Sequence, residues 1–258
     1  MPFVLATDGT RLHFETAGNG PALVLQTGGA GDGSMWRDAG YVEALSTGYK
    51  CVLFDHRGHG LSDQPTRREA HSMERYVDDI VELLDQVGVE RAGFWGYSQG
   101  GIIGLALGAL HPERLTALLM TGAMETPDRK LHAAENLEGA EALRTHGWHP
   151  DGYRSEPEES VPAWFQRHFD STNPEMLALW LDCEAEWDTW SLLSSVTVPV
   201  QMFVGDLEDP DHLNEKAAEL MRYASVSRLE GLDHLDAFIR SDLVMPEATA
   251  FLARVVGH

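Results

Sequence analysis

The chain has 258 residues, and hydrophobic residues make up 43% of it, enough to fill the core of one α/β domain with a modest insertion. Acidic residues number 41 against 19 basic ones, which gives a formal net charge of −22. Because so acidic a surface repels phosphate backbones and anionic membranes, we expect neither a nucleic-acid nor a membrane partner.

No targeting or anchoring signal is evident. The segment Met1–Asp8 lacks a basic region followed by a long apolar stretch, and no stretch of the chain approaches the length of a membrane-spanning helix. Cys51 and Cys183 are too few for a disulfide framework, and no metal-ligand spacing surrounds them. These features predict a cytoplasmic protein.

The first predicted element is a hairpin. Phe3–Ala6 and Arg11–Thr16 look like two short strands joined at Asp8-Gly9, a common turn dipeptide. We expect this hairpin to add antiparallel strands at one edge of a larger sheet.

Short apolar runs then alternate with helical stretches. The runs are typical of strands buried on both faces, and they lie at Ala22–Leu25, Tyr49–Phe54, Arg91–Trp95, Leu115–Met120 and Val198–Val204. The helical stretches are Met73–Val87, Gly101–Leu110, Leu213–Tyr223 and Leu243–Val256, and Ala224–Leu229 resembles a last strand. This alternation predicts an α/β fold, a mostly parallel, doubly wound sheet with helices on both faces.

Composition changes between about Met124 and Ser195. This stretch lacks buried-strand runs, is rich in acidic residues and histidine, and is divided by prolines. It also carries Trp148, Trp164, Trp180, Trp187 and Trp190. Since it falls between two core strands, we interpret residues 124–195 as a helical cap inserted into a core made of residues 1–123 and 196–258. Clustered tryptophans beside a cleft suggest an apolar pocket.

The most informative segment is Gly96-Tyr97-Ser98-Gln99-Gly100. It follows the run Arg91–Trp95 and precedes the apolar stretch Ile102–Leu110, so it predicts a strand–turn–helix elbow that presents the Ser98 hydroxyl. Glycines at both ends of the turn let strand and helix approach closely. The N-terminus of the following helix points N–H groups to where an oxyanion would develop.

An activated serine needs a base and an acid that orients it. In the chain order serine, acid, histidine, the acid follows a late strand and the histidine lies near the C-terminus. Asp206, Glu208 and Asp209 follow Val198–Val204, and His234 follows the strand-like Ala224–Leu229. His234 is the predicted base.

Together these segments resemble the α/β-hydrolase superfamily over nearly the whole chain outside the insertion. Asp55-His56-Arg57-Gly58-His59-Gly60-Leu61-Ser62 is similar to the family's D-x-R-G-x-G-x-S loop, and Gly231–His234 is similar to its histidine loop. The first of these is structural in the family, which implies that His56 and His59 belong to the scaffold. The resemblance implies an α/β-hydrolase fold with an inserted helical cap.

The sequence departs from the family pattern after the third strand. Thr27 stands where many relatives carry histidine, in Leu25-Gln26-Thr27-Gly28-Gly29-Ala30. The resemblance implies that the N–H groups of Gly29 and Gln99 form the oxyanion hole, which needs no histidine. A glycine at position 29 would leave room beside the reacting carbonyl.

The acid is the second departure. The family count from the glycine that closes the late strand falls on Glu208, and on Asp209 if the turn is one residue longer. Asp206 is a third candidate, and Glu125 or Asp128 after Leu115–Met120 are weaker ones.

These features predict a serine hydrolase that cleaves a small or medium ester, lactone or thioester through an acyl-enzyme, without metal or organic cofactor. C–C bond hydrolysis or cofactor-free perhydrolysis by the same triad is an alternative, and so is a ligand-binding protein with little turnover. The expected partner is a small-molecule substrate, and the sequence indicates no oligomeric state.

Overall fold

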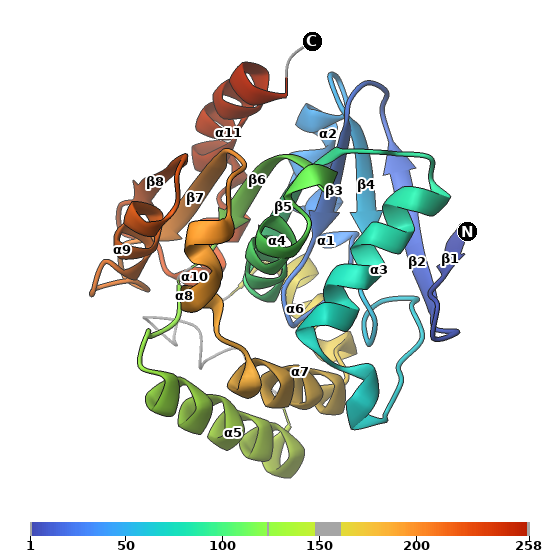
Figure 1. Ribbon diagram of the computed structural model, residues 1–258. Coiled ribbons are helices and arrows are strands. Elements are labelled where there is room, and N and C mark those ends of the chain that lie inside the picture. Colours follow the sequence, from blue (N-terminus) through green and yellow to red (C-terminus); the bar gives the residue numbers. More distant parts are fainter. Residues whose placement is uncertain (1, 123, 148–160, 257–258) are drawn as a thin grey trace.

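The computed structural model describes residues 2–122, 124–147 and 161–256. The described strands form one eight-stranded sheet in the order β1-β2-β4-β3-β5-β6-β7-β8 (Figure 1). The strands are β1 (Phe3–Leu5), β2 (Arg11–Ala17), β3 (Ala22–Gln26), β4 (Lys50–Phe54), β5 (Ala92–Tyr97), β6 (Leu115–Thr121), β7 (Val200–Gly205) and β8 (Ala224–Leu229).

The sheet is parallel from β4 to β8, and β1 and β2 are antiparallel at one edge. This confirms both the mostly parallel sheet and the edge hairpin predicted from the sequence. Parallel strands need covering on both faces, which explains why the inner strands are continuous apolar runs.

Helices cover both faces of the sheet. Side chains of a strand alternate between faces, so Val24 packs into one buried cluster while Leu23 and Leu25 pack into the other. The first cluster includes residues of α3 (Met73–Gln86), α4 (Gln99–Leu110) and α9 (Leu213–Leu220). The second includes residues of α1 (Met35–Asp38), α2 (Tyr41–Leu45) and α11 (Ser241–Val255). The doubly wound architecture is therefore confirmed.

Some helices were not expected from the sequence. They are α1, α2 and α10 (His234–Ile239), together with the 3₁₀ turns η1 (Arg68–Ala70) and η2 (Pro112–Arg114). Each is too short to repeat a helical pattern, so no period marks it in the sequence. Among the helices that the structure describes, none is long and apolar enough to cross a membrane.

The predicted insertion is helical where it is described. It contains α5 (Arg129–His146), α6 (Ala163–Ser171), α7 (Pro174–Glu186), α8 (Thr189–Leu192) and η4 (Leu193–Ser195), between β6 and β7. Helices α5 and α7 lie side by side (Figure 1). Leu177, Ala178 and Trp180 of α7 join the same buried cluster as α3 and α4, so the insertion packs onto the core. Its boundaries at residues 124 and 195 remain predictions.

Residues 148–160 of the insertion, Trp148 among them, lie outside the described part of the chain. The other tryptophans of the insertion differ in burial. Trp180 is only 2% exposed, whereas Trp164, Trp187 and Trp190 pack partly buried against the two core clusters.

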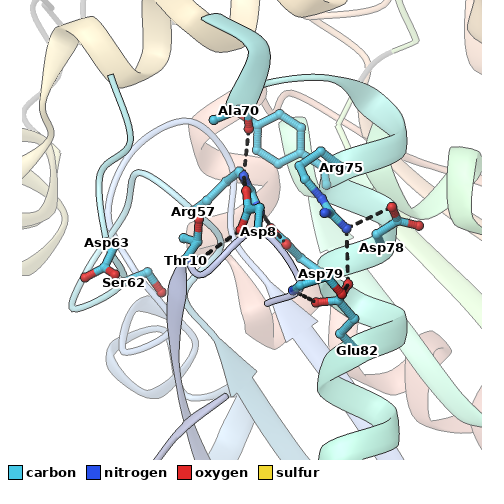
Figure 2. Close-up of polar contacts among 12 residues, drawn as sticks. Asp8, Thr10, Arg57, Ser62, Asp63, Ala70, Arg75, Asp78, Asp79 and Glu82 are labelled. Atoms are coloured by element: carbon cyan, nitrogen blue, oxygen red, sulfur yellow. Dashed lines mark hydrogen bonds and ion pairs between the residues drawn. The ribbon is translucent and has the colours of Figure 1, made fainter. Parts of the chain in front are cut away.

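The loop after β4 is held by Arg57, whose side chain is fully buried. Its guanidinium donates two hydrogen bonds of 2.6 Å to Asp79 of α3, and further ones to Asp8 in the β1–β2 turn and to the Ala70 carbonyl (Figure 2). Burial opposes the charge on Arg57, but the Asp79 and Asp8 carboxylates outweigh it and keep the pKa of Arg57 above its usual range. This loop therefore joins the edge hairpin to α3.

Candidate active site

Ser98 stands at a sharp turn between β5 and α4. Its backbone has φ 53° and ψ −122°, a conformation that non-glycine residues rarely adopt. A Cβ on Gly96 would overlap the Gly100 carbonyl, and one on Gly100 would lie 2.6 Å from the Gln26 carbonyl oxygen. The turn therefore needs glycine at both positions, as expected for a nucleophile elbow.

Ser98 is the first member of a hydrogen-bonded chain of three side chains. His234 Nε2 lies 3.0 Å from Ser98 Oγ, and His234 Nδ1 lies 2.6 Å from Glu208 Oε2. The carboxylate accepts from Nδ1–H, which leaves Nε2 unprotonated and able to take the serine proton. Serine, histidine and glutamate come from three separate strand ends, after β5, β8 and β7.

Glu208 is itself fixed by the turn that follows β7. Its other oxygen, Oε1, accepts a hydrogen bond of 3.0 Å from the Gly205 main-chain N–H. The side chain is 8% exposed, so the carboxylate faces the imidazole with little water around it. The contact is well placed to orient His234.

Asp209 points elsewhere although it is the next residue. Its carboxylate accepts from the N–H groups of Leu213 and Asn214 at the start of α9, at 2.7 and 3.2 Å, and lies 3.3 Å from Arg228. It therefore holds the N-terminus of a helix.

The remaining acid candidates also have other partners. Asp206 accepts from the Gly231 N–H at 2.7 Å, and Asp128 accepts from two N–H groups at the start of α5. Glu125 lies 2.7 Å from His132 Nδ1. None of these contacts involves His234.

The loop after β3 lies directly against the serine. A Cβ on Gly28 would lie 2.7 Å from Ser98 Cβ, and Gly29 and Gln99 line the same cavity as Ser98. The space beside Gly29 is not open, however, because a Cβ there would overlap Leu177 Cδ1 of α7. The position of a Cβ at Gly29 is thus taken by the insertion, while Gly29 itself still lines the cavity.

His56 and His59 are buried behind this loop, with their rings stacked 3.9 Å apart. His59 Nε2 donates a hydrogen bond of 2.9 Å to the Gly29 carbonyl. Burial lowers the pKa of both rings, which favours their neutral forms. His59 therefore supports the glycine loop, and His56 packs against His59.

The serine, the histidine and the glutamate line a cavity of about 450 Å³. Its apolar wall comes largely from the insertion, with Phe165, Phe169, Leu177, Trp180 and Leu181. This size falls within the range of small-molecule sites. Across the described residues, no group of three or more His, Cys, Asp or Glu side chains is arranged to hold a metal ion.

Two supporting residues were missed in the sequence. The Tyr97 ring stacks on His234 with centroids 5.1 Å apart, and its hydroxyl donates to the His234 carbonyl at 3.2 Å. Asp233 accepts from Leu235 and Asp236 N–H groups and so begins α10 directly beside His234. The Asp-x-x pattern of a helix N-cap could have indicated the second contact, but nothing local indicates the first.

Comparison with known proteins identifies the family to which the chain belongs. The model of the α/β hydrolase fold family matches residues 21–174, more than half of the chain. The chain belongs to the α/β hydrolase fold family. The match agrees with the elbow at Ser98, the strand order of the sheet and the contacts that link Ser98, His234 and Glu208.

Known members of this family differ in their named activities. Over 117 residues the chain is 38% identical to RutD of Caulobacter sp. (strain K31), provisionally named a carbamate hydrolase, covering 45% of this chain and 42% of that protein. The chain thus matches less than half the length of this curated relative.

Solved structures match over nearly the full chain. An enol-lactonase from Burkholderia xenovorans LB400 has a TM-score of 0.79 at 26% identity and covers 97% of this chain and 99% of its own. A thermophilic esterase from Thermogutta terrifontis has a TM-score of 0.82 at 23% identity and covers 98% of both chains. The second likeness concerns the fold alone.

Proposed function

We propose that the protein is a serine hydrolase in which Ser98 is the nucleophile, His234 the general base and Glu208 the orienting acid. The observation that carries the proposal is the continuous contact from Ser98 Oγ through the two ring nitrogens of His234 to the Glu208 carboxylate, inside a cavity of substrate size.

In the first step Ser98 Oγ attacks the carbonyl carbon of the substrate, and its proton passes to His234 Nε2. Glu208 stabilises the imidazolium that forms. When the tetrahedral intermediate collapses, the leaving group takes that proton and departs, which leaves an acyl group on Ser98. Water, deprotonated by the same nitrogen, then releases the acid and restores the serine.

The N–H groups of Gly29 and Gln99 are proposed to hold the oxyanion. Gln99 is the first residue of α4, so its N–H lies at the positive end of that helix. Each donor would contribute on the order of 3 kcal/mol to the stability of the transition state. The proposal is supported by the close approach of Gly28 to Ser98 and by the position of Gly29 and Gln99 in the cavity lining.

The proposed substrate is a small or medium ester, lactone or thioester with an apolar body. The aromatic and aliphatic side chains of the insertion provide an apolar wall beside Ser98. The names of two relatives, a carbamate hydrolase and an enol-lactonase, both concern hydrolysis at a carbonyl carbon that bears a heteroatom.

An activity-based fluorophosphonate tests the nucleophile. We expect it to add to the wild-type chain at a single site, found at Ser98 by mass spectrometry, and to leave the Ser98→Ala variant unmodified. Ser98→Ala should also lose hydrolysis of 4-nitrophenyl acetate while its free energy of unfolding stays within about 1 kcal/mol of wild type. A variant that kept most of its activity would contradict the serine mechanism.

A further inference from the structure

The cavity contains a second group of polar side chains that the proposed reaction does not use. Glu184 of α7 and Glu125, which precedes α5, line it together with Ser98 and His234. Glu184 is only 4% exposed. Buried carboxyl groups are uncommon unless a partner satisfies them, so this pair calls for a physical explanation.

His132 of α5 contacts both glutamates. Its Nε2 lies 3.0 Å from the Glu184 main-chain oxygen, which can only accept, so Nε2 carries a proton. Its Nδ1 lies 2.7 Å from Glu125 Oε2. The hydrogen bond with the Glu125 carboxyl group raises the pKa of His132, which favours the doubly protonated ring.

The surroundings of Glu184 favour its protonated form. Its side chain interacts with that of Glu125, and two carboxyl groups in contact cannot both be ionised at little cost. Burial and the neighbouring Glu125 raise the pKa of Glu184 well above its usual range. A protonated carboxyl group keeps one oxygen that can only accept a hydrogen bond.

Glu184 Oε1 is buried and has no hydrogen-bond partner among the residues that the structure describes. The described lining of the cavity includes Glu125, Glu184, Glu208 and Asp233 but neither lysine nor arginine. Such a wall favours a ligand group that donates a hydrogen bond and disfavours an anionic one.

We propose that Glu184 determines specificity by accepting a hydrogen bond from a hydroxyl or ammonium group at the end of the substrate away from the scissile carbonyl. This inference rests on the proposed function, because it assigns the far end of the substrate that Ser98 would attack. The substrates favoured by this geometry are hydroxy- or amino-substituted acyl compounds, and substrates with a carboxylate at that end are rejected.

A series of 4-nitrophenyl esters tests the inference. Acyl chains of matched length, in a range of lengths, end in a methyl, hydroxyl, ammonium or carboxylate group. At one acyl-chain length, we expect the kcat/KM of the wild type to be about tenfold higher for the better of the two donor esters, hydroxyl or ammonium, than for the methyl ester. A factor of about ten corresponds to the free energy of one hydrogen bond. The carboxylate ester should be the poorest substrate. Comparison of the hydroxyl and ammonium esters shows which donor the site binds.

Variants of Glu184 separate this contact from general packing. Glu184→Leu removes the acceptor and should abolish the preference of donor over methyl. Glu184→Gln should keep the hydroxyl preference, because its amide N–H can face Glu125 while its oxygen replaces Oε1. Glu186→Gln on the same helix is the matched control, since the Glu186 side chain is 80% exposed, and it should leave all ratios unchanged.

The outcomes are distinguishable. Absence of 4-nitrophenyl acetate hydrolysis by the wild type would contradict the proposed function. Hydrolysis without any donor preference, or a preference that Glu184→Leu retains, would overturn this inference alone. If Glu184→Leu does not fold, loss of the hydroxyl preference in Glu184→Gln would overturn it as well, with thermal melts used to check that each variant is folded.

Discussion

Glu208 and Asp209 are neighbours in the chain, yet their carboxylates serve different parts of the molecule. Glu208 faces His234 Nδ1, whereas Asp209 faces the start of α9 and Arg228. The side chains of consecutive residues leave the backbone in different directions, so a shift of one residue exchanges the two roles. Only the turn after β7 sets that direction.

Substitution of the two acids separates these roles. We expect Glu208→Gln to lower kcat by up to about 10⁴-fold, because the amide would favour the wrong imidazole tautomer. Asp209→Asn should lower the free energy of unfolding by about 1 kcal/mol through the weakened helix start, with a much smaller change in kcat. Steady-state kinetics and urea unfolding of both variants measure the split. The reverse ranking would show that Asp209 orients the base.

At the scale of elements, α7 packs the insertion against the cavity that Ser98 lines. Leu177 occupies the space beside Gly29, and Glu184, two turns further along the helix, lines the same cavity. A single helix thus contacts the glycine loop after β3 and also forms part of the cavity wall. The carboxyl group that it buries also makes stability depend on pH.

The pH dependence of unfolding tests the buried carboxyl group. A folded-state pKa above the unfolded value of 4.5 means that Glu184 stabilises the fold at low pH and that this contribution is lost as pH rises. Glu184→Gln cannot ionise. The free energy of unfolding of this variant should therefore rise relative to that of the wild type. The difference should grow by up to about 1.4 kcal/mol for each pH unit above the unfolded-state pKa of 4.5.

Urea unfolding of both proteins over a range of pH measures this difference, and each comparison at one pH cancels the other titrating groups. Glu186→Gln provides the control, and its difference from wild type should be flat. A flat difference for Glu184→Gln would mean that Glu184 is ionised in the folded chain.

At the scale of the whole molecule, the Arg57 network joins segments that are far apart in sequence. It links the β1–β2 turn, the loop after β4 and α3 through one buried guanidinium (Figure 2). Removal of one partner would leave a charge in the interior without full compensation, which costs more than the intact ion pair contributes.

We therefore expect Asp79→Asn to lower the free energy of unfolding by about 3–5 kcal/mol. Asp78→Asn is the control, because Asp78 is 49% exposed and pairs with Arg75 on the same helix, and its effect should stay within about 0.5 kcal/mol. Chemical denaturation of the two variants gives the comparison. Equal effects would show that the buried pair contributes no more than a surface one.

The sheet, the longer helices on its two faces and the elbow around Ser98 could be predicted from the sequence. These depend on local patterns, namely apolar runs, helical periodicity and glycines at fixed spacing, which act wherever the chain folds. The family pattern also predicted His234 as the base and limited the candidate acids to a few residues.

The tertiary structure alone showed which carboxylate faces His234, that Leu177 fills the space beside Gly29, and that Glu125, His132 and Glu184 meet. The reason is physical in each case. A side chain's direction after a strand depends on the turn that follows, and the helices of the insertion carry no short-range signal of the surface they cover. Contacts between residues so far apart in the chain exist only once the insertion has packed onto the sheet.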